Sequence, residues 1–221
     1  MKLLTIYSLL LSIFFYLPAA FAEQKPLRIA NSSVAEPNIV SGFQFQSSQW
    51  VNLHHFLYER ARSNKEASVV ANDTELSDEN SQTLKAAIAF YKKEYINRSL
   101  LFDDQLSLIK TQLSHTKNNF VNNQLSNNKI PDVLLTHLNA VASLYEKHFW
   151  AGHHNENTVW INKAKTLLAI HGEIIQDKLE KIFQHKLYIT PIKYDIVYAP
   201  AYWAGAYTMD GHAVITSSRA D

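Results

Sequence analysis

The chain has 221 residues, with 21 basic and 20 acidic side chains and no cysteine. So small a net charge argues against nucleic acid or an anionic membrane surface as a partner. The absence of cysteine excludes disulfide bonds as a source of stability. A chain of this length can bury a sizeable core, so we expect one domain stabilised by burial of apolar side chains.

The segment 1–22 has the features of a secretory signal peptide. Lys2 precedes an apolar stretch from Leu3 to Leu17, and Ala20-Phe21-Ala22 has the small-x-small pattern that signal peptidase cleaves. We therefore predict cleavage after Ala22 and a bacterial periplasmic or secreted protein with no stable membrane insertion. The alternative is a retained N-terminal anchor, because the apolar stretch approaches the length of a bilayer span.

Residues 23–46 show no sustained period and contain prolines, so we predict a linker or surface arm. Residues 47–187 are predicted to be helical, because their apolar side chains recur at helical spacing. The expected inward stripes are Trp50, Leu53, Leu57 and Ala61; Leu84, Ala87, Ile88, Tyr91 and Tyr95; Leu106, Ile109 and Leu113; Leu134, Leu138, Val141, Tyr145 and Phe149; and Trp160, Ala164, Leu167 and Leu168.

Capping residues set the expected helix boundaries. Ser47-Ser48 and Ser77 can cap helix starts, and Pro131 suits the first position of a helix because its missing N–H needs no partner there. We expect Ala151-Gly152 to end one helix, a new helix to begin near Asn157 or Thr158, and Gly172 to interrupt that helix.

In residues 188–221 the apolar period changes to two, which is typical of strands. Ile192, Tyr194, Ile196 and Tyr198 alternate with Lys193, Asp195 and Val197, which predicts a strand with unequal faces. Two further strands flank Asp210-Gly211, a turn dipeptide. The expected fold class is α+β, predominantly helical with about five helices and a small C-terminal antiparallel β hairpin or sheet.

Histidines form the densest group of candidate metal ligands. His148, His153 and His154 have spacings that zinc sites use, but no fourth ligand is evident. The alternative is that His148 ends a helix and the other two lie in a solvated loop. His54 shares the apolar face of the first helix, so we expect a buried histidine with its hydrogen bonds made, rather than one that supports a site.

The segment Tyr198–Tyr207, YAPAYWAGAY, alternates small and aromatic residues where a strand is expected. Such an edge strand can pair with an extended peptide through its outward N–H and C=O groups. The alternative is a hairpin whose aromatic side chains cover the helices. No His-Glu-x-x-His, Gly-x-Ser-x-Gly or phosphate-binding glycine loop occurs, so no catalytic residues are predicted.

Three stretches resemble a poorly characterised family of exported bacterial proteins that look like gluzincin-type zinc metallopeptidases. They are LHHFLYERAR (Leu53–Arg62), YEKHFWAGHHNENTVWI (Tyr145–Ile161) and YDIVYAPAYWAGAYTMDGHAVITSS (Tyr194–Ser218). The resemblance implies a substrate-binding edge strand formed by Tyr202, Trp203, Ala204, Gly205, Ala206 and Tyr207. Pro200-Ala201 departs from the Ala-Asn more usual in the family.

In that family a helix bearing His-Glu-x-x-His follows this strand and binds zinc. The chain stops at Asp221, before such a helix, so the resemblance implies a truncated relative that is inactive alone. Residues 188–221 would then be the incomplete start of a catalytic unit. Zinc is expected only in a full-length relative, and no cofactor is expected here. The alternative is a non-catalytic periplasmic module that binds a peptide or protein.

Overall fold

The computed structural model describes residues 39–63, 76–100, 102–117, 120, 124–126, 129–187, 190–198, 205–209 and 212–217. The segment 1–38, with the predicted signal peptide and the cleavage site after Ala22, lies outside these ranges. The described residues are mostly helical with one small sheet, as the predicted class requires. None of the described helices combines the length and the apolar character needed to cross a bilayer.

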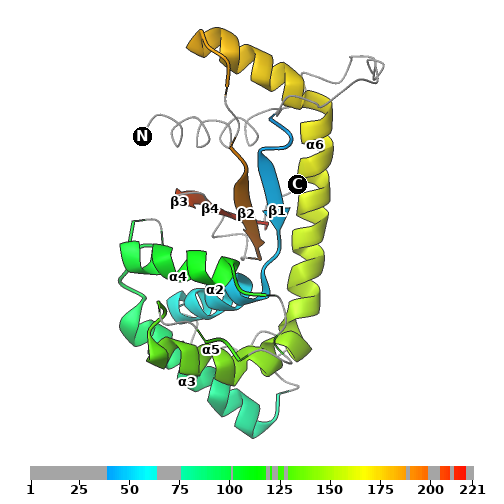
Figure 1. Ribbon diagram of the computed structural model, residues 1–221. Helices are drawn as coiled ribbons and strands as arrows, with labels where there is room; N and C mark the ends of the chain where they lie inside the picture. Colours follow the sequence, from blue (N-terminus) through cyan, green and yellow to red (C-terminus); the bar gives the residue numbers. More distant parts are fainter. Residues whose placement is uncertain are drawn as a thin grey trace.

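A group of helices forms the lower part of the molecule in Figure 1. These helices are α2 (Gln49–Arg62), α3 (Asp78–Glu94), α4 (Asp104–Ser114) and α5 (Asp132–Tyr145). Ser48 and Ser77 cap α2 and α3 as predicted, each hydroxyl accepting a backbone N–H three residues later. Pro131 precedes α5 as its N-cap and is not its first residue.

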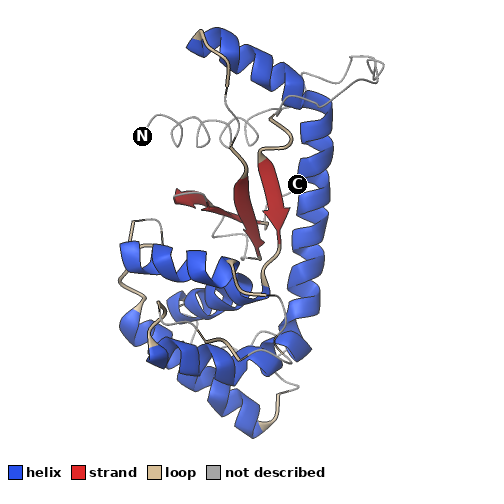
Figure 2. Ribbon diagram, viewed as in Figure 1, coloured by secondary structure: helices blue, strands red, loops and turns tan. Residues whose placement is uncertain are grey.

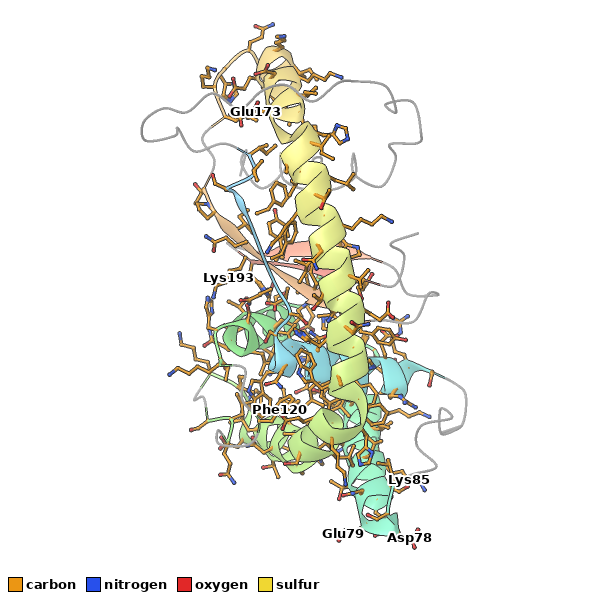
Figure 3. The ribbon with its side chains drawn as sticks, turned by 90° about the vertical axis from the view of Figure 1, so that its right-hand side faces the viewer. Asp78, Glu79, Lys85, Phe120, Glu173 and Lys193 are labelled. Carbon is orange, nitrogen blue, oxygen red and sulfur yellow. The ribbon has the colours of Figure 1, made fainter. Side chains whose placement is uncertain are left out.

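The first four predicted stripes meet in a core between these helices. The fifth is wrong in part, because Leu168 packs against the sheet whereas Leu167 is exposed. Trp50, Leu57, Tyr91, Leu106 and Tyr145 are all fully buried in the core between the helices. Burying side chains of this size stabilises a fold by about 1.5–3 kcal/mol each. Figure 3 shows the start of α3, marked by Asp78 and Glu79, at the end of the molecule remote from the sheet.

The predicted helix end at Ala151-Gly152 is wrong. The π-helical turn η2 (Glu146–Trp150) joins α5 directly to α6 (Ala151–Phe183), and Ala151 keeps helical φ and ψ of −58° and −43°. An isolated glycine costs a helix only about 1 kcal/mol, so Gly152 need not end it. A π turn inserts a residue and redirects the axis, and the run changes direction between α5 and α6 in Figure 1.

Gly172 does not interrupt α6 either. A Cβ at this position would lie 2.8 Å from Val40 Cγ2 and 3.1 Å from Ile39 Cγ2. The glycine therefore allows the turn before the first strand to pack closely against the helix. The helix ends at Phe183, and its C-cap Gln184 has a left-handed φ of 55°.

The sheet contains β1 (Phe43–Gln46), β2 (Ile192–Val197), β3 (Ala206–Met209) and β4 (His212–Thr216). Its order is β1-β2-β4-β3; β1 and β4 run parallel to β2, and only β3 is antiparallel to its neighbour β4. The predicted antiparallel sheet is therefore wrong except for the β3–β4 pair. The predicted confinement to the C-terminal segment is also wrong, because β1 lies in the segment interpreted as an arm.

Helices pack on β2 from both faces, α6 on one and α2 on the other. Figure 2 shows the sheet in red, with α6 beside it and the group of helices that includes α2 beneath it. On one face Tyr194, Ile196 and Ile215 pack with Ile161 and Leu168 of α6; Figure 3 shows α6 lying across the front of the strands. On the other face, Val197 and Val214 join the helical core. Strand β2 is thus buried on both sides, and the predicted difference between its faces is wrong for residues 194–197.

Candidate functional site

Strand β3 is one margin of the sheet, and in Figure 2 it points away from α6. Of the predicted substrate-binding residues, Ala206 and Tyr207 lie in β3, and Gly205 directly precedes it. Tyr202, Trp203 and Ala204 lie outside the described residues. Gly205 is exposed and Ala206 is half-buried. A Cβ at Gly205 would meet none of the described atoms within 4 Å.

Hydrogen bonds with Thr216 hold Gly205, the residue directly before β3, in place. Its backbone N–H donates to the Gly205 carbonyl at 3.0 Å, while its hydroxyl accepts the Gly205 N–H at 2.8 Å and donates to the same carbonyl at 3.2 Å. The side chain of Thr216 therefore completes the pairing at the position where β3 begins.

The register of the hairpin determines which backbone groups point outward. Antiparallel pairs alternate between those that exchange hydrogen bonds and those that do not. Because Thr216 bonds Gly205, the non-bonded pairs are Ala206–Ile215 and Thr208–Ala213. The N–H and C=O groups of Ala206 and Thr208 consequently face away from β4. In the described part of the chain no further strand pairs with them. We call these outward groups the β3 margin.

The three histidines of the metal hypothesis all lie in helices, so the alternative of a solvated loop is wrong for His153 and His154. His148 is in η2, whereas His153 and His154 are in the first turn of α6. His153 stacks on Tyr198 and His154 packs on Trp150. Within the described ranges, no three histidine, cysteine, aspartate or glutamate side chains are placed to hold one metal ion.

His153 is held from several sides. Its ring lies parallel to Tyr198, with 4.2 Å between centroids and 11° between planes. The Tyr145 hydroxyl is 2.9 Å from its Nδ1, and Phe56 and Phe149 flank the ring. Burial and the nearby positive charge of Arg60 lower the pKa of His153 to about 4. The imidazole is therefore neutral at pH 7.

A buried polar junction lies between the sheet and the start of α2. Asp195 Oδ2 accepts from His212 Nε2 at 2.8 Å and from Gln46 Nε2 at 3.1 Å, and its Oδ1 accepts the Ser48 N–H at 3.2 Å. Gln46 also donates to the hydroxyl of Ser114 at the end of α4, at 3.0 Å. Asp195 is fully buried and His212 is 2% exposed. We call these five residues the polar junction.

A second buried group ties α2 to α6 and β2. Asn157 Nδ2 donates to Ser47 Oγ and Asn52 Oδ1, both at 2.9 Å. Asn52 in turn donates to the Ile196 carbonyl and accepts the Tyr198 N–H. Sequence analysis did not identify this group or the polar junction. Nothing local in the sequence marks them, because each group joins distant segments of the chain, up to 149 residues apart between Gln46 and Asp195.

The prediction for His54 is half correct. The side chain is fully buried and its Nδ1 lies 2.8 Å from the Tyr91 hydroxyl. Its Nε2 is buried without a hydrogen-bond partner in the described structure, so the ring is not fully satisfied. Burial, helped by the charge of Lys110, lowers the pKa of His54 to about 3. The ring stays neutral and contributes to packing.

No protein-family model, curated protein or solved structure matches this chain. The resemblance to zinc metallopeptidase-like proteins consequently rests on the three sequence stretches alone. The functional argument has to come from the residues themselves.

Proposed function

We propose that this chain forms the peptide-binding part of an exported zinc metallopeptidase-like protein, and that an extended peptide pairs with the β3 margin. The observation that carries the proposal is the position of β3 as the outer, antiparallel strand of the sheet. Its outward groups at Ala206 and Thr208 can bond a peptide backbone as another strand would.

Burial elsewhere in the sheet favours the same function. Strands β2 and β4 are covered on both faces and paired on both edges. In the described chain, backbone groups available for pairing therefore remain on the two outer strands, β1 and β3, and the predicted substrate-binding residues lie on β3. Proteins normally shorten, charge or cover an exposed edge strand, because such a strand promotes aggregation. One reason for leaving an edge strand open is that it binds a peptide.

Hydrolysis by the chain itself is not part of the proposal. The sequence has no His-Glu-x-x-His, and the described residues do not bring three metal ligands together. The described residues offer no set of side chains that fits a catalytic zinc ion, so no chemical step is assigned to one. Export to the periplasm or medium, directed by residues 1–22, remains part of the proposal.

The peptide-binding proposal is tested with a probe of alternating threonine and valine, acetylated and amidated at its ends. Thr208→Pro removes one outward N–H while leaving the N–H groups that face β4, and proline is tolerated on edge strands. We expect the dissociation constant to rise at least tenfold, measured by isothermal titration calorimetry. Thr208→Val is the matched control, because it keeps the N–H. Equal binding by both variants would contradict the proposal.

A second function, a binding module with no catalytic relative, uses the same β3 margin. The two hypotheses differ in what lies beyond the peptide-binding strand, and the coding sequence downstream of the Asp221 codon distinguishes them. A helix with His-Glu-x-x-His encoded there would favour the metallopeptidase-like protein.

A further inference from the structure

Helix α6 carries exposed apolar side chains on the face that points away from the sheet. Figure 3 views the molecule from this side, with α6 in front of the strands. The buried side chains of α6, such as Leu168, pack toward the sheet. On the roughly opposite side of the helix, the exposed fractions are 55% for Val159, 36% for Leu167, 60% for Ile170 and 42% for Ile174. We call these four residues the α6 stripe.

The spacing of the α6 stripe is that of a surface that pairs with another helix. Leu167, Ile170 and Ile174 are separated by three and four residues, as the a and d positions of a heptad repeat are. Of the eight large apolar side chains exposed in the described chain, five lie on α6. Apolar side chains that gather on one exposed element, rather than being scattered singly, indicate an interaction surface.

Charged residues lie on the same seam at both ends of the α6 stripe. The heptad positions before the stripe include Lys163 and Glu156, and those after it are Asp177 and Lys181. All four side chains are exposed. None of them forms an ion pair with another described residue. The seam therefore has an apolar centre with one acidic and one basic side chain at each end.

A second copy of α6 that runs antiparallel to the first matches these charges. When Leu167 of one copy faces Ile170 of the other, Glu156 faces Lys181 of the second copy, because a step forward along one helix is a step back along the other. The same register sets Ile174 against the aliphatic stem of Lys163, whose amine is less than one turn from Asp177 of the second copy. Parallel pairing would instead place each charge beside its own like.

We propose that the α6 stripe joins two copies of this chain into an antiparallel, two-fold symmetric dimer. Leu167 and Ile170 meet at the symmetry axis, and a pair between Glu156 and Lys181 forms at each end, because every contact in such a dimer occurs twice. Residues 156–181 of α6 are about 38 Å long. Strand β3 points away from α6 in Figure 2, so the dimer does not use the β3 margin and does not depend on peptide binding there.

Sedimentation velocity tests the dimer directly. The average mass of the wild-type chain should rise from monomer to dimer between about 1 and about 200 µM. Ile170→Glu brings like charges together at the symmetry axis and should raise the dimer dissociation constant at least tenfold. Lys165→Glu, at an exposed position on another face of α6, is the control and should behave as the wild type does. A wild-type chain that stays monomeric throughout this range, even one that binds lipid vesicles through the stripe, would overturn the proposal.

A charge exchange tests the register without altering the apolar centre. Lys181→Glu turns both attractive pairs into repulsive ones, so we expect the dissociation constant to rise about tenfold. Combining it with Glu156→Lys reverses both signs and should return the affinity to that of the wild type. A double variant that dimerises no better than Lys181→Glu alone would contradict the antiparallel register.

Single cysteines test the direction of the helices, because the chain has no cysteine of its own. Ile170→Cys lies near the symmetry axis and should form a disulfide-linked dimer under mild oxidation. Lys181→Cys should not, because its counterpart lies at the far end of the antiparallel pair. Linkage through Lys181→Cys would show parallel helices and would overturn the proposal.

Discussion

The polar junction and the β3 margin belong to one sheet but use their polar groups in opposite ways. At the junction, Asp195 accepts hydrogen bonds from β1, β4 and the start of α2, and it is fully buried. At the margin, backbone groups of Ala206 and Thr208 point away from the only strand that pairs with β3 in the described chain.

This difference indicates that the polar groups of the junction serve stability, whereas those of the margin are available for binding. Burying an ionised carboxylate is tolerated only when several donors surround it, so the junction mainly fixes how the helices and strands meet. Outward backbone groups on an edge strand have no such structural task. A variant at the junction should therefore change stability, whereas one at the margin should change binding.

The largest effect is expected at the junction itself. Asp195→Ala leaves His212, Gln46 and the Ser48 N–H without their shared acceptor. We expect a loss of about 3–5 kcal/mol in the free energy of unfolding, measured by urea denaturation. Asp177→Ala, at an exposed position on α6, is the control and should stay within about 0.5 kcal/mol of wild type. A similarly small effect at Asp195 would contradict the structural role.

Acid should destabilise the protein through its buried histidines. Burial lowers the pKa of His54 to about 3 and that of His153 to about 4, from an ordinary 6.5. The unfolded chain therefore binds more protons below pH 6.5, and stability falls as the pH drops from about 6.5 toward 4. A pKa that is lower by one in the folded state corresponds to about 1.4 kcal/mol in the free energy of unfolding. The two histidines together should therefore cost a few kcal/mol of stability at pH 4.

The contribution of His54 can be isolated by urea denaturation between pH 7.5 and 4.5. His54→Leu should lose less stability over this interval than the wild type, even if it is less stable at pH 7.5. Glu59 works in the opposite direction, because burial raises the pKa of its carboxyl to about 7. Protonation of Glu59 therefore adds stability between pH 7 and about 4.5. Identical pH profiles for the wild type and His54→Leu would disprove the role of the buried imidazole.

Alanine substitutions at two glycines of α6 should change the stability of the protein in opposite directions. Gly172→Ala places a Cβ 2.8 Å from Val40, so we expect a loss of about 1–3 kcal/mol from overpacking. Gly152→Ala meets no atom within 4 Å and should add up to about 1 kcal/mol from helix propensity. Thermal melts of the two variants provide the comparison, and a stabilising Gly172→Ala would show that the turn before β1 does not pack on α6.

The smallest effect is expected where β3 begins. Thr216→Val removes the hydroxyl that bonds both backbone groups of Gly205 but keeps the backbone bond between the two residues. Global stability should fall by about 1 kcal/mol, while amide exchange at Gly205 should become distinctly faster. Unchanged exchange at Gly205 would mean that Thr216 does not fix the margin.

Helices were predictable because their signal is local. The stripe Trp50, Leu53, Leu57 and Ala61 is buried along α2, and the stripe Leu134, Leu138, Val141 and Tyr145 is buried along α5. Ser48 and Ser77 begin their helices as capping residues should. Each of these signals lies within a few residues of the structure that it specifies.

The sheet was harder to predict because its signals are distant. Phe43–Gln46 is too short to show alternation, and it becomes a strand only by pairing with β2, 149 residues later. Asp195 looks like a solvent-facing residue until α2 and β4 enclose it. The predicted edge position of Ala206 and Tyr207 agrees with β3 as an outer strand, with Gly205 directly before it, but only the register specifies which backbone groups point outward.

The most direct test of the peptide-binding claim is amide hydrogen exchange with and without the alternating threonine–valine probe. If the peptide pairs with the β3 margin, the amides of Ala206 and Thr208 should become protected, whereas those of Tyr207 and Val214, which face one another across the hairpin, should not change. Protection of neither outward amide at saturating probe, or protection confined to another element, would contradict the account.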